Sequence, residues 1–238
     1  MRFTDYIFDL YGTLADICTD ESPAVFWEGA AQDAERFGAQ YTGEGLRREY
    51  LRLCADEVRL RAATLPDVPI TYIEPELLNV FRRLLNECGA DEARAEAFAK
   101  AFRRRSTLWL RPMPHALETL DALKKSGART FLLSNAQSCF TTDELKALDL
   151  TGRFDGILLS SDAGMKKPYR ALFELLLSRY GIDRKTAVMV GNDAVADIGG
   201  ADAAGLKSFY YHTWQSGARP DSLPVSCREI PDLSSLIE

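Results

Sequence analysis

The sequence of 238 residues contains few of the side chains on which several kinds of protein chemistry depend. It has only two histidines, His115 and His212, which lie far apart, so a His-rich metal cage and an H-E-x-x-H metalloprotease helix are excluded. Its five cysteines are scattered and form no C-x-x-C pair. This pattern argues against a disulfide framework and against a zinc site built from thiolates.

Basic charge and long apolar runs are also scarce. Lysine and arginine total 29 against 35 aspartates and glutamates, a net charge of −6 at pH 7, and nucleic-acid binding rests on a basic surface. There is no run of about 18 apolar residues of the kind that spans a membrane. The first segment, MRFTDYIFDL, carries acidic residues within its apolar stretch, unlike a signal peptide. We therefore expect a cytoplasmic protein with no nucleic-acid or membrane partner, either a monomer or a homodimer.

What the sequence does contain is typical of a soluble globular protein, with 46% hydrophobic and 27% charged residues. Helical patterns separate most of its short apolar runs, and these runs end at turn-forming residues. The runs are Tyr6–Phe8, Thr130–Leu133, Ile157–Leu159, Ala187–Val190 and Ser208–Tyr211. The helices predicted between the later runs are Thr142–Leu150, one opened by Lys166-Lys167-Pro168 and running through Ala171–Tyr180, and Val195–Ala204. Such alternation predicts an α/β fold with a parallel sheet covered by helices on both faces.

The segment 16–107 interrupts this alternation. It is rich in Ala, Arg, Glu and Leu, and its patterns predict four amphipathic helices: Ala24–Phe37, Gly45–Ala63, Pro75–Cys88 and Asp91–Arg105. Two closely spaced prolines, Pro112 and Pro114, mark the return to the sheet. We therefore predict a discontinuous core domain, residues 1–15 plus 108–238, with an all-helical domain of residues 16–107 inserted in it.

Polar side chains occupy the carboxyl ends of the predicted strands, where open parallel sheets bind ligands. They are Asp9 after the first strand, Ser134 and Asn135 after the second, Lys167 after the third, and Asn192, Asp193 and Asp197 after the fourth. Carboxylates suit a hard cation such as Mg²⁺, whereas lysine and hydroxyl groups neutralise and orient a phosphoryl group.

Four sequence motifs, in order, carry a resemblance to a known family: YIFDLYGTL, FLLSNA, GMKKP and VMVGNDAVADIGGADAAGL. The sequence resembles the haloacid dehalogenase superfamily over nearly its whole length, in the class with a helical cap between the first and second motifs. This resemblance implies a three-layer, Rossmann-like parallel-sheet core with an inserted all-helical cap domain.

The resemblance also implies covalent catalysis. Asp9 is the expected nucleophile, forming an aspartyl intermediate that water then cleaves. Ser134 and Lys167 are expected to hold the anion, with Thr13 and Asn135 as further substrate-binding residues. The expected Mg²⁺ ligands are Asp9, Asp193 and Asp197, with Asn192 close by.

Tyr11 departs from the pattern of the family's phosphatases, which carry a second Asp there as general acid and base. The ordinary pKa of tyrosine is near 10, so Tyr11 is a poor base at neutral pH. The family's 2-haloacid dehalogenases carry a similar D-x-Y-G-T sequence, and their halide leaves without a proton.

A second departure favours the phosphatases. The dehalogenases need no metal and have an Asn where this chain has Ala194 and a Tyr where it has Phe173. Asp193 and Asp197 fit the D-x-x-x-D spacing of the metal ligands in the family's phosphatases. A different alignment of the motif places Asn192 at the first ligand position and Asp197 at the second. Asp193 also suits a helix N-cap, so which residue binds the metal stays open.

These features predict a Mg²⁺-dependent phosphatase acting on a small phosphorylated metabolite, with weakened acid–base catalysis because of Tyr11. One alternative is a metal-independent 2-haloacid dehalogenase. Another is a catalytically weak protein that binds phosphate or a partner.

Overall fold

A six-stranded, wholly parallel sheet organises the computed structural model, which describes residues 3–85 and 91–237. The strands run in the order β5-β4-β1-β6-β7-β8. They are β1 (Asp5–Phe8), β4 (Arg129–Ser134), β5 (Gly156–Leu159), β6 (Ala187–Gly191), β7 (Lys207–Tyr211) and β8 (Cys227–Ile230). The predicted α/β fold with its parallel sheet is confirmed.

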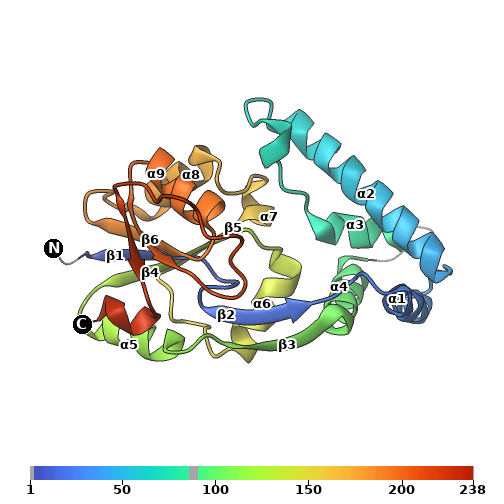
Figure 1. The fold of residues 1–238 in the computed structure, drawn as a ribbon. Helices are drawn as coiled ribbons and strands as arrows, with labels where there is room; N and C mark the ends of the chain where they lie inside the picture. Colours follow the sequence, from blue (N-terminus) through green and yellow to red (C-terminus); the bar gives the residue numbers. More distant parts are fainter. Residues whose placement is uncertain (1–2, 86–90, 238) are drawn as a thin grey trace.

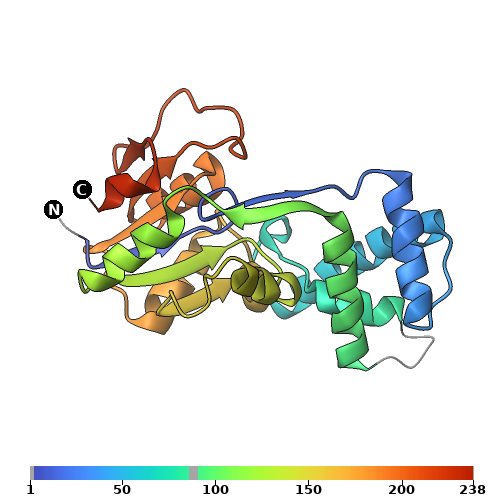
Figure 2. The ribbon, with the colours of Figure 1, turned by 90° about the horizontal axis from the view of Figure 1, so that it is seen from below.

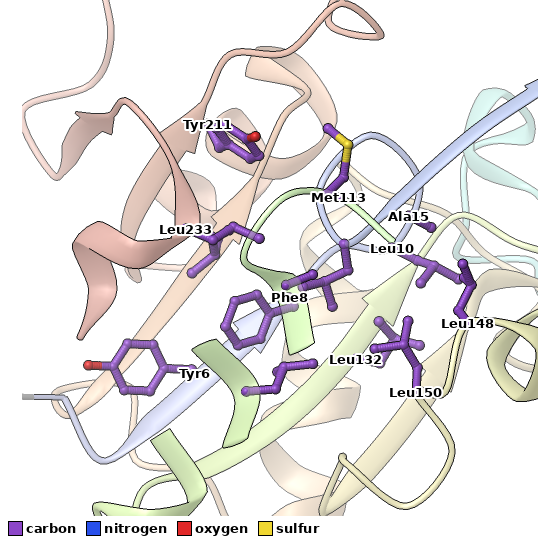
Figure 3. Close-up of a cluster of buried hydrophobic side chains, with 14 of the residues drawn as sticks. Tyr6, Phe8, Leu10, Ala15, Met113, Leu132, Leu148, Leu150, Tyr211 and Leu233 are labelled. Atoms are coloured by element: carbon purple, nitrogen blue, oxygen red, sulfur yellow. The ribbon is translucent and has the colours of Figure 1, made fainter. Parts of the chain in front are cut away.

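Alternation along the strands supplies a core on each face of the sheet. In β1, Tyr6 and Phe8 belong to one buried cluster and Ile7 to the other. Figure 3 shows Tyr6 and Phe8 in the first cluster, with Leu132 of β4 and Leu233 beside them. That face is covered by α5 (Ala116–Lys125), α6 (Ser138–Ala147) and η4 (Leu233–Leu236), and the other by α8 (Arg170–Tyr180) and α9 (Gly200–Ala203).

Among the described residues, four α-helices between β2 and β3 pack together beside the sheet, and we call them the helical module. They are α1 (Ala24–Arg36), α2 (Gly43–Thr64), α3 (Leu77–Leu84) and α4 (Glu92–Ser106). The ribbon of β2 (Ala15–Thr19) and β3 (Thr107–Pro112), paired antiparallel, joins the module to the sheet (Figures 1 and 2). Within the described residues, no helix combines the length and the apolar character that crossing a membrane requires.

The module has its own aromatic core. Phe102 of α4 is almost fully buried and lies with its ring centroid 4.9 Å from that of Phe26, 5.2 Å from that of Tyr50 and 5.2 Å from that of Phe81. Phe140 of α6 joins the same cluster from the sheet domain. The core of the module therefore continues into the interface with the sheet.

A second link to the sheet domain is the docking segment, residues 65–76, which includes η1 (Ile70–Tyr72). Its backbone pairs with the loop before α8: Lys166 N donates to Tyr72 O at 2.9 Å, and Glu74 N donates to Gly164 O at 3.0 Å. The rings of Tyr72 and Tyr169 stack with their centroids 5.3 Å apart. The module is thus held both by the β2–β3 ribbon and by this segment.

Some boundaries differ from the sequence prediction. The helix expected at Thr142–Leu150 is α6, which begins at Ser138. Within it, the hydroxyl groups of Thr141 and Thr142 donate to the carbonyls four residues earlier, so the helix accommodates both residues. It ends at Ala147, before Asp149 adopts a positive φ of 56°.

The predicted helix Val195–Ala204 was wrong as a single α-helix. It is a π-helical turn, η3 (Ala194–Gly199), followed by α9, because Asp193 O accepts bonds from both Asp197 N and Ile198 N. The residues opening α8 were also misplaced: the short helix α7 (Ser160–Ala163) follows β5, and Lys167 lies in the loop before α8. The last residues of the predicted helix Pro75–Cys88 lie outside the described residues.

The aromatic core of the module gives a stability prediction. We expect Phe102→Ala to lower the free energy of unfolding by about 3–5 kcal/mol, because it empties a well-packed site. Leu108→Ala on the exposed face of β3 is the matched control, with an expected change of at most about 0.5 kcal/mol. Urea denaturation measures both, and equal losses in the two variants would contradict the packing described here.

Candidate active site

Asp9 lies directly after β1, where the chain turns sharply at the carboxyl edge of the sheet. The carbonyl of Leu10 accepts hydrogen bonds from the backbone of residues 13, 14 and 15, which closes the turn. Gly12 has a φ of +86°, and a Cβ there would collide with the side chain of Asn192. The turn therefore requires glycine for two reasons, and it holds the Asp9 carboxylate at a fixed place.

Lys167 joins two carboxylates at the centre of the site. Its Nζ lies 2.7 Å from Asp9 Oδ1 and 2.6 Å from Asp197 Oδ1, and it donates a third bond to Leu133 O at 2.8 Å. The side chain of Lys167 is 1% exposed. All three ammonium hydrogens are thus used, and one positive charge is shared by two buried carboxylates.

Ser134 and Asn135, at the end of β4, serve different parts of this arrangement. Ser134 Oγ donates to Asp9 Oδ1 at 3.2 Å. The amide of Asn135 accepts from Lys167 N at 2.8 Å and donates to Lys167 O at 3.1 Å, so it fixes the backbone that carries the lysine. The structure brings both residues to the site, and their roles toward a substrate stay predictions.

Thr13 reaches the second carboxylate oxygen of Asp9. Its hydroxyl lies 3.4 Å from Asp9 Oδ2 and 3.2 Å from Asn192 Oδ1, with one proton for two acceptors. Asp9 Oδ1 accepts hydrogen bonds from Lys167 and Ser134, so Oδ2 is the oxygen with fewer and longer hydrogen bonds.

The two acidic residues of the fourth motif occupy distinct places. Asp193 is exposed, and its carboxylate caps η3 by accepting from Val195 N and Ala196 N, both at 2.8 Å. Asp197 is buried, and its second oxygen accepts from Asp193 N at 2.9 Å. Burial raises the pKa of the Asp197 carboxyl above its ordinary value, although Lys167 acts to lower that pKa.

Tyr11 points its hydroxyl toward α6 and is part of a network that the sequence did not predict. The hydroxyl donates to Glu144 and lies 3.0 Å from Thr141 Oγ1. Arg103 of α4 donates to Glu144 at 2.6 Å, and its guanidinium lies 5.7 Å from the centroid of the Tyr11 ring. Burial, followed by the charge of Glu144, raises the pKa of Tyr11, so its phenol stays protonated.

One cavity of about 200 Å³ collects eight of the nine predicted site residues. Those lining it are Asp9, Tyr11, Ser134, Asn135, Lys167, Asn192, Asp193 and Asp197, and Thr13 is fully buried. Gln215 also lines it and was missed, because it lies in a loop after β7 with no motif of its own. Its Nε2 donates to Ile17 O at 2.7 Å, and its buried Oε1 has no hydrogen-bond partner within the described residues.

Carboxylate and amide oxygens line this cavity beside the ammonium group of Lys167, and such oxygens suit a hard cation. Asp9 Oδ2 and Asn192 Oδ1 both lie within reach of the Thr13 hydroxyl, and Mg²⁺ commonly takes one or two carboxylates and completes its shell with water and phosphate oxygens. Within residues 3–85 and 91–237, no three acidic, histidine or cysteine side chains form a ready metal cluster. The carboxylate and amide oxygens of Asp9 and Asn192 are of the kind that a hard cation binds.

Sequence comparison matches residues 6–205 to the family of haloacid dehalogenase-like hydrolases. The chain belongs to this family. The predicted superfamily is thereby confirmed, and with it the assignment of the chain as a hydrolase.

Curated relatives of this hydrolase are named as phosphatases. The chain is 32% identical to the phosphoserine phosphatase of Thermus thermophilus over 157 residues, which cover 65% of this chain and 59% of that protein. It is 27% identical to the phosphoglycolate phosphatase of Salmonella typhi over 210 residues, which cover 84% of this chain and 78% of that protein. Across the first five relatives, the match spans about half of their length, from 41% to 59%.

Solved structures of the family share the fold over nearly the whole chain. A 2-haloacid dehalogenase from Pseudomonas syringae is 25% identical with a TM-score of 0.61, covering 98% of this chain and 96% of that one. A haloacid dehalogenase-type phosphatase from Thermococcus onnurineus is 19% identical with a TM-score of 0.62, covering 99% and 96%. The fold alone is therefore compatible with either chemistry.

The shared ammonium of Lys167 gives a prediction that depends on pH. We expect Lys167→Met to lose about 3–5 kcal/mol of stability at pH 7, because two buried carboxylates then face each other without a counter-charge. Their pKa values in the folded variant rise above the unfolded values, so the loss shrinks as the pH falls and the carboxyls take up protons.

Urea unfolding of the wild type and the variant at pH 7 and pH 5 measures this difference. Lys166→Met, which removes a charge one residue away on a partly exposed side chain, is the control and should change stability by less than about 1 kcal/mol. A deficit in Lys167→Met that is the same at both pH values would contradict the shared-charge arrangement.

Proposed function

We propose that this hydrolase is a phosphatase of small phosphorylated metabolites that uses Asp9 as its nucleophile. The observation that carries the proposal is the Asp9 carboxylate at the cavity, whose Oδ1 accepts from Lys167 and Ser134 while Oδ2 has, among the described residues, only a long hydrogen bond from Thr13. A fixed carboxylate beside an ammonium and hydroxyl groups suits attack on a phosphoryl group and binding of its oxygens. The phosphatase names of the curated relatives support the same chemistry.

In the proposed reaction, Asp9 Oδ2 bonds to phosphorus and the bond to the leaving oxygen breaks. Water then attacks phosphorus, the bond to Asp9 breaks with its electron pair returning to the carboxylate, and both water protons end on the phosphate released. Lys167 and Ser134 orient Asp9 throughout, and Asn135 holds the lysine backbone in place.

Tyr11 supplies no proton to the leaving group in this scheme. Its hydroxyl is committed to Glu144, and burial keeps its pKa high, so neither general acid nor general base catalysis is available from it near neutral pH. The enzyme is therefore expected to favour leaving groups that are stable as anions.

A divalent cation, Mg²⁺, completes the proposal. Asp9 and Asn192 would hold it, with Asp193 or Asp197 as a further ligand. When bound, it neutralises phosphate charge. Asn192 supplies only a neutral amide oxygen, so binding without substrate is expected to be weak.

The leaving-group preference is tested by comparing p-nitrophenyl phosphate with ethyl phosphate in Mg²⁺, using Asp9→Asn as the blank. We expect hydrolysis of the aryl ester to exceed that of the alkyl ester by about 10²-fold or more. Without a general acid, the alkoxide must leave unprotonated, whereas p-nitrophenolate is stable as an anion. Tyr11→Asp, which introduces a carboxyl group, should narrow this ratio. Equal rates on the two esters in the wild type would sink the assignment of Tyr11.

Metal dependence is tested by titrating Mg²⁺ into chelator-treated enzyme and following hydrolysis of p-nitrophenyl phosphate. We expect activity to disappear in excess chelator and return with Mg²⁺. Asn192→Asp, which adds a carboxylate to the site, should lower the Mg²⁺ concentration needed for half-maximal activity by about tenfold. Full activity in chelator would remove the metal from the proposal.

Tyr11 also favours a second candidate, a metal-independent 2-haloacid dehalogenase, because halide departs without a proton. The dehalogenase structure that is 25% identical adds support. Chloride release from 2-chloropropionate, unaffected by chelator and absent in Asp9→Asn, would establish it. A stable phosphoadduct on Asp9 with no turnover would instead indicate a protein that binds phosphate or a partner.

A further inference from the structure

A second cavity, of about 350 Å³, adjoins the candidate active site. It lies between the sheet domain and the helical module, since its lining includes Ala136 after β4 and Tyr50 of α2. Tyr11 and Asn135 line both this cavity and the one that contains Asp9. A substrate whose phosphoryl group lies at Asp9 therefore has room for the rest of its structure here. We call this space the module cavity.

Most polar groups of the module cavity already have partners. The amide of Asn135 is bonded to the backbone of Lys167, and the amide of Gln137 is bonded to the docking segment and the start of α3. Arg103 donates to Glu144 at 2.6 Å, which offsets its charge. These groups hold the walls of the cavity together.

Glu21, between β2 and α1, is different. Trp27 Nε1 donates to its backbone carbonyl at 2.8 Å, but no hydrogen bond or ion pair joins its carboxylate to the described residues. Burial raises the pKa of Glu21, and the more distant charge of Arg103 lowers it. A partly buried carboxylate without a partner is unfavourable, so a ligand that donates to it gains the interaction that the protein omits.

We infer that Glu21 selects phosphate monoesters that carry a protonated amine on the part of the molecule bound in the module cavity. This inference rests on the proposed phosphatase function. An ammonium group matches the Glu21 carboxylate in charge and in its hydrogen-bond donors, and the ring of Tyr50, which also lines the cavity, suits a cation. A carboxylate on the substrate would be repelled by Glu21. Arg103 would do little to attract it, because Glu144 already offsets the charge of Arg103.

Three esters of equal chain length test the inference: 2-aminoethyl phosphate, 2-hydroxyethyl phosphate and phosphoglycolate. We expect kcat/KM for the amine to exceed that for the alcohol by about tenfold or more, and the carboxylate to be the poorest of the three. In Glu21→Gln, which keeps the shape of the side chain, the ratio of amine to alcohol should fall to near one. Glu28→Gln on the exposed side of α1 removes the same charge without touching the cavity and should leave the ratio as in the wild type.

A wild-type ratio near one, or a ratio that survives Glu21→Gln, would overturn the inference. Failure of the proposed function is distinguishable, because then neither these esters nor p-nitrophenyl phosphate is hydrolysed. In that case, calorimetry of 2-aminoethyl phosphate and 2-hydroxyethyl phosphate binding to Asp9→Asn decides the matter. Tighter binding of the amine that Glu21→Gln removes would sustain the subsite, and equal binding would end it.

Discussion

The site depends on one buried ammonium group. Lys167 shares its single positive charge between Asp9 and Asp197, whose side chains are 9% and 1% exposed. Burying charge is unfavourable unless every charge has partners, so the surrounding elements must bring three separate chain segments together with little tolerance. The turn after β1, the loop before α8 and the π-helical turn η3 each supply one member of this cluster.

Tyr11 makes contacts that a shorter carboxyl side chain at this position could not make. Where the family's phosphatases are expected to carry a proton-transferring carboxyl group, this chain has a phenol directed to Glu144 of α6, which also binds Arg103 of α4. The position therefore links the catalytic turn to the helical module. Tyr11 is therefore part of the interface between the sheet domain and the helical module, and it lacks the carboxyl group that would exchange protons.

The sequence predicted those features that depend on local periodicity and strand order. Asp9, Ser134 and Asp197 were placed correctly at one edge, because parallel strands align their carboxyl ends. The ion pair of Lys167 with Asp197 was not predicted, since it joins the loop before α8 to η3. The positions of Glu21 and Gln215 were not predicted either, because they depend on how distant segments pack. Strand β8 was missed because two of its four residues are exposed, so it lacks an apolar run.

The docking segment has a mechanical consequence. Its backbone is bonded to residues 164 and 166, immediately before Lys167, whose ammonium group is bonded to Asp9. If the helical module were tethered by the β2–β3 ribbon alone, it could swing away and leave the catalytic groups undisturbed. With the docking segment in place, movement of the helical module away from the sheet must either break these bonds or displace the loop that positions Lys167. Displacement of the helical module and displacement of the loop that carries Lys167 are therefore mechanically coupled.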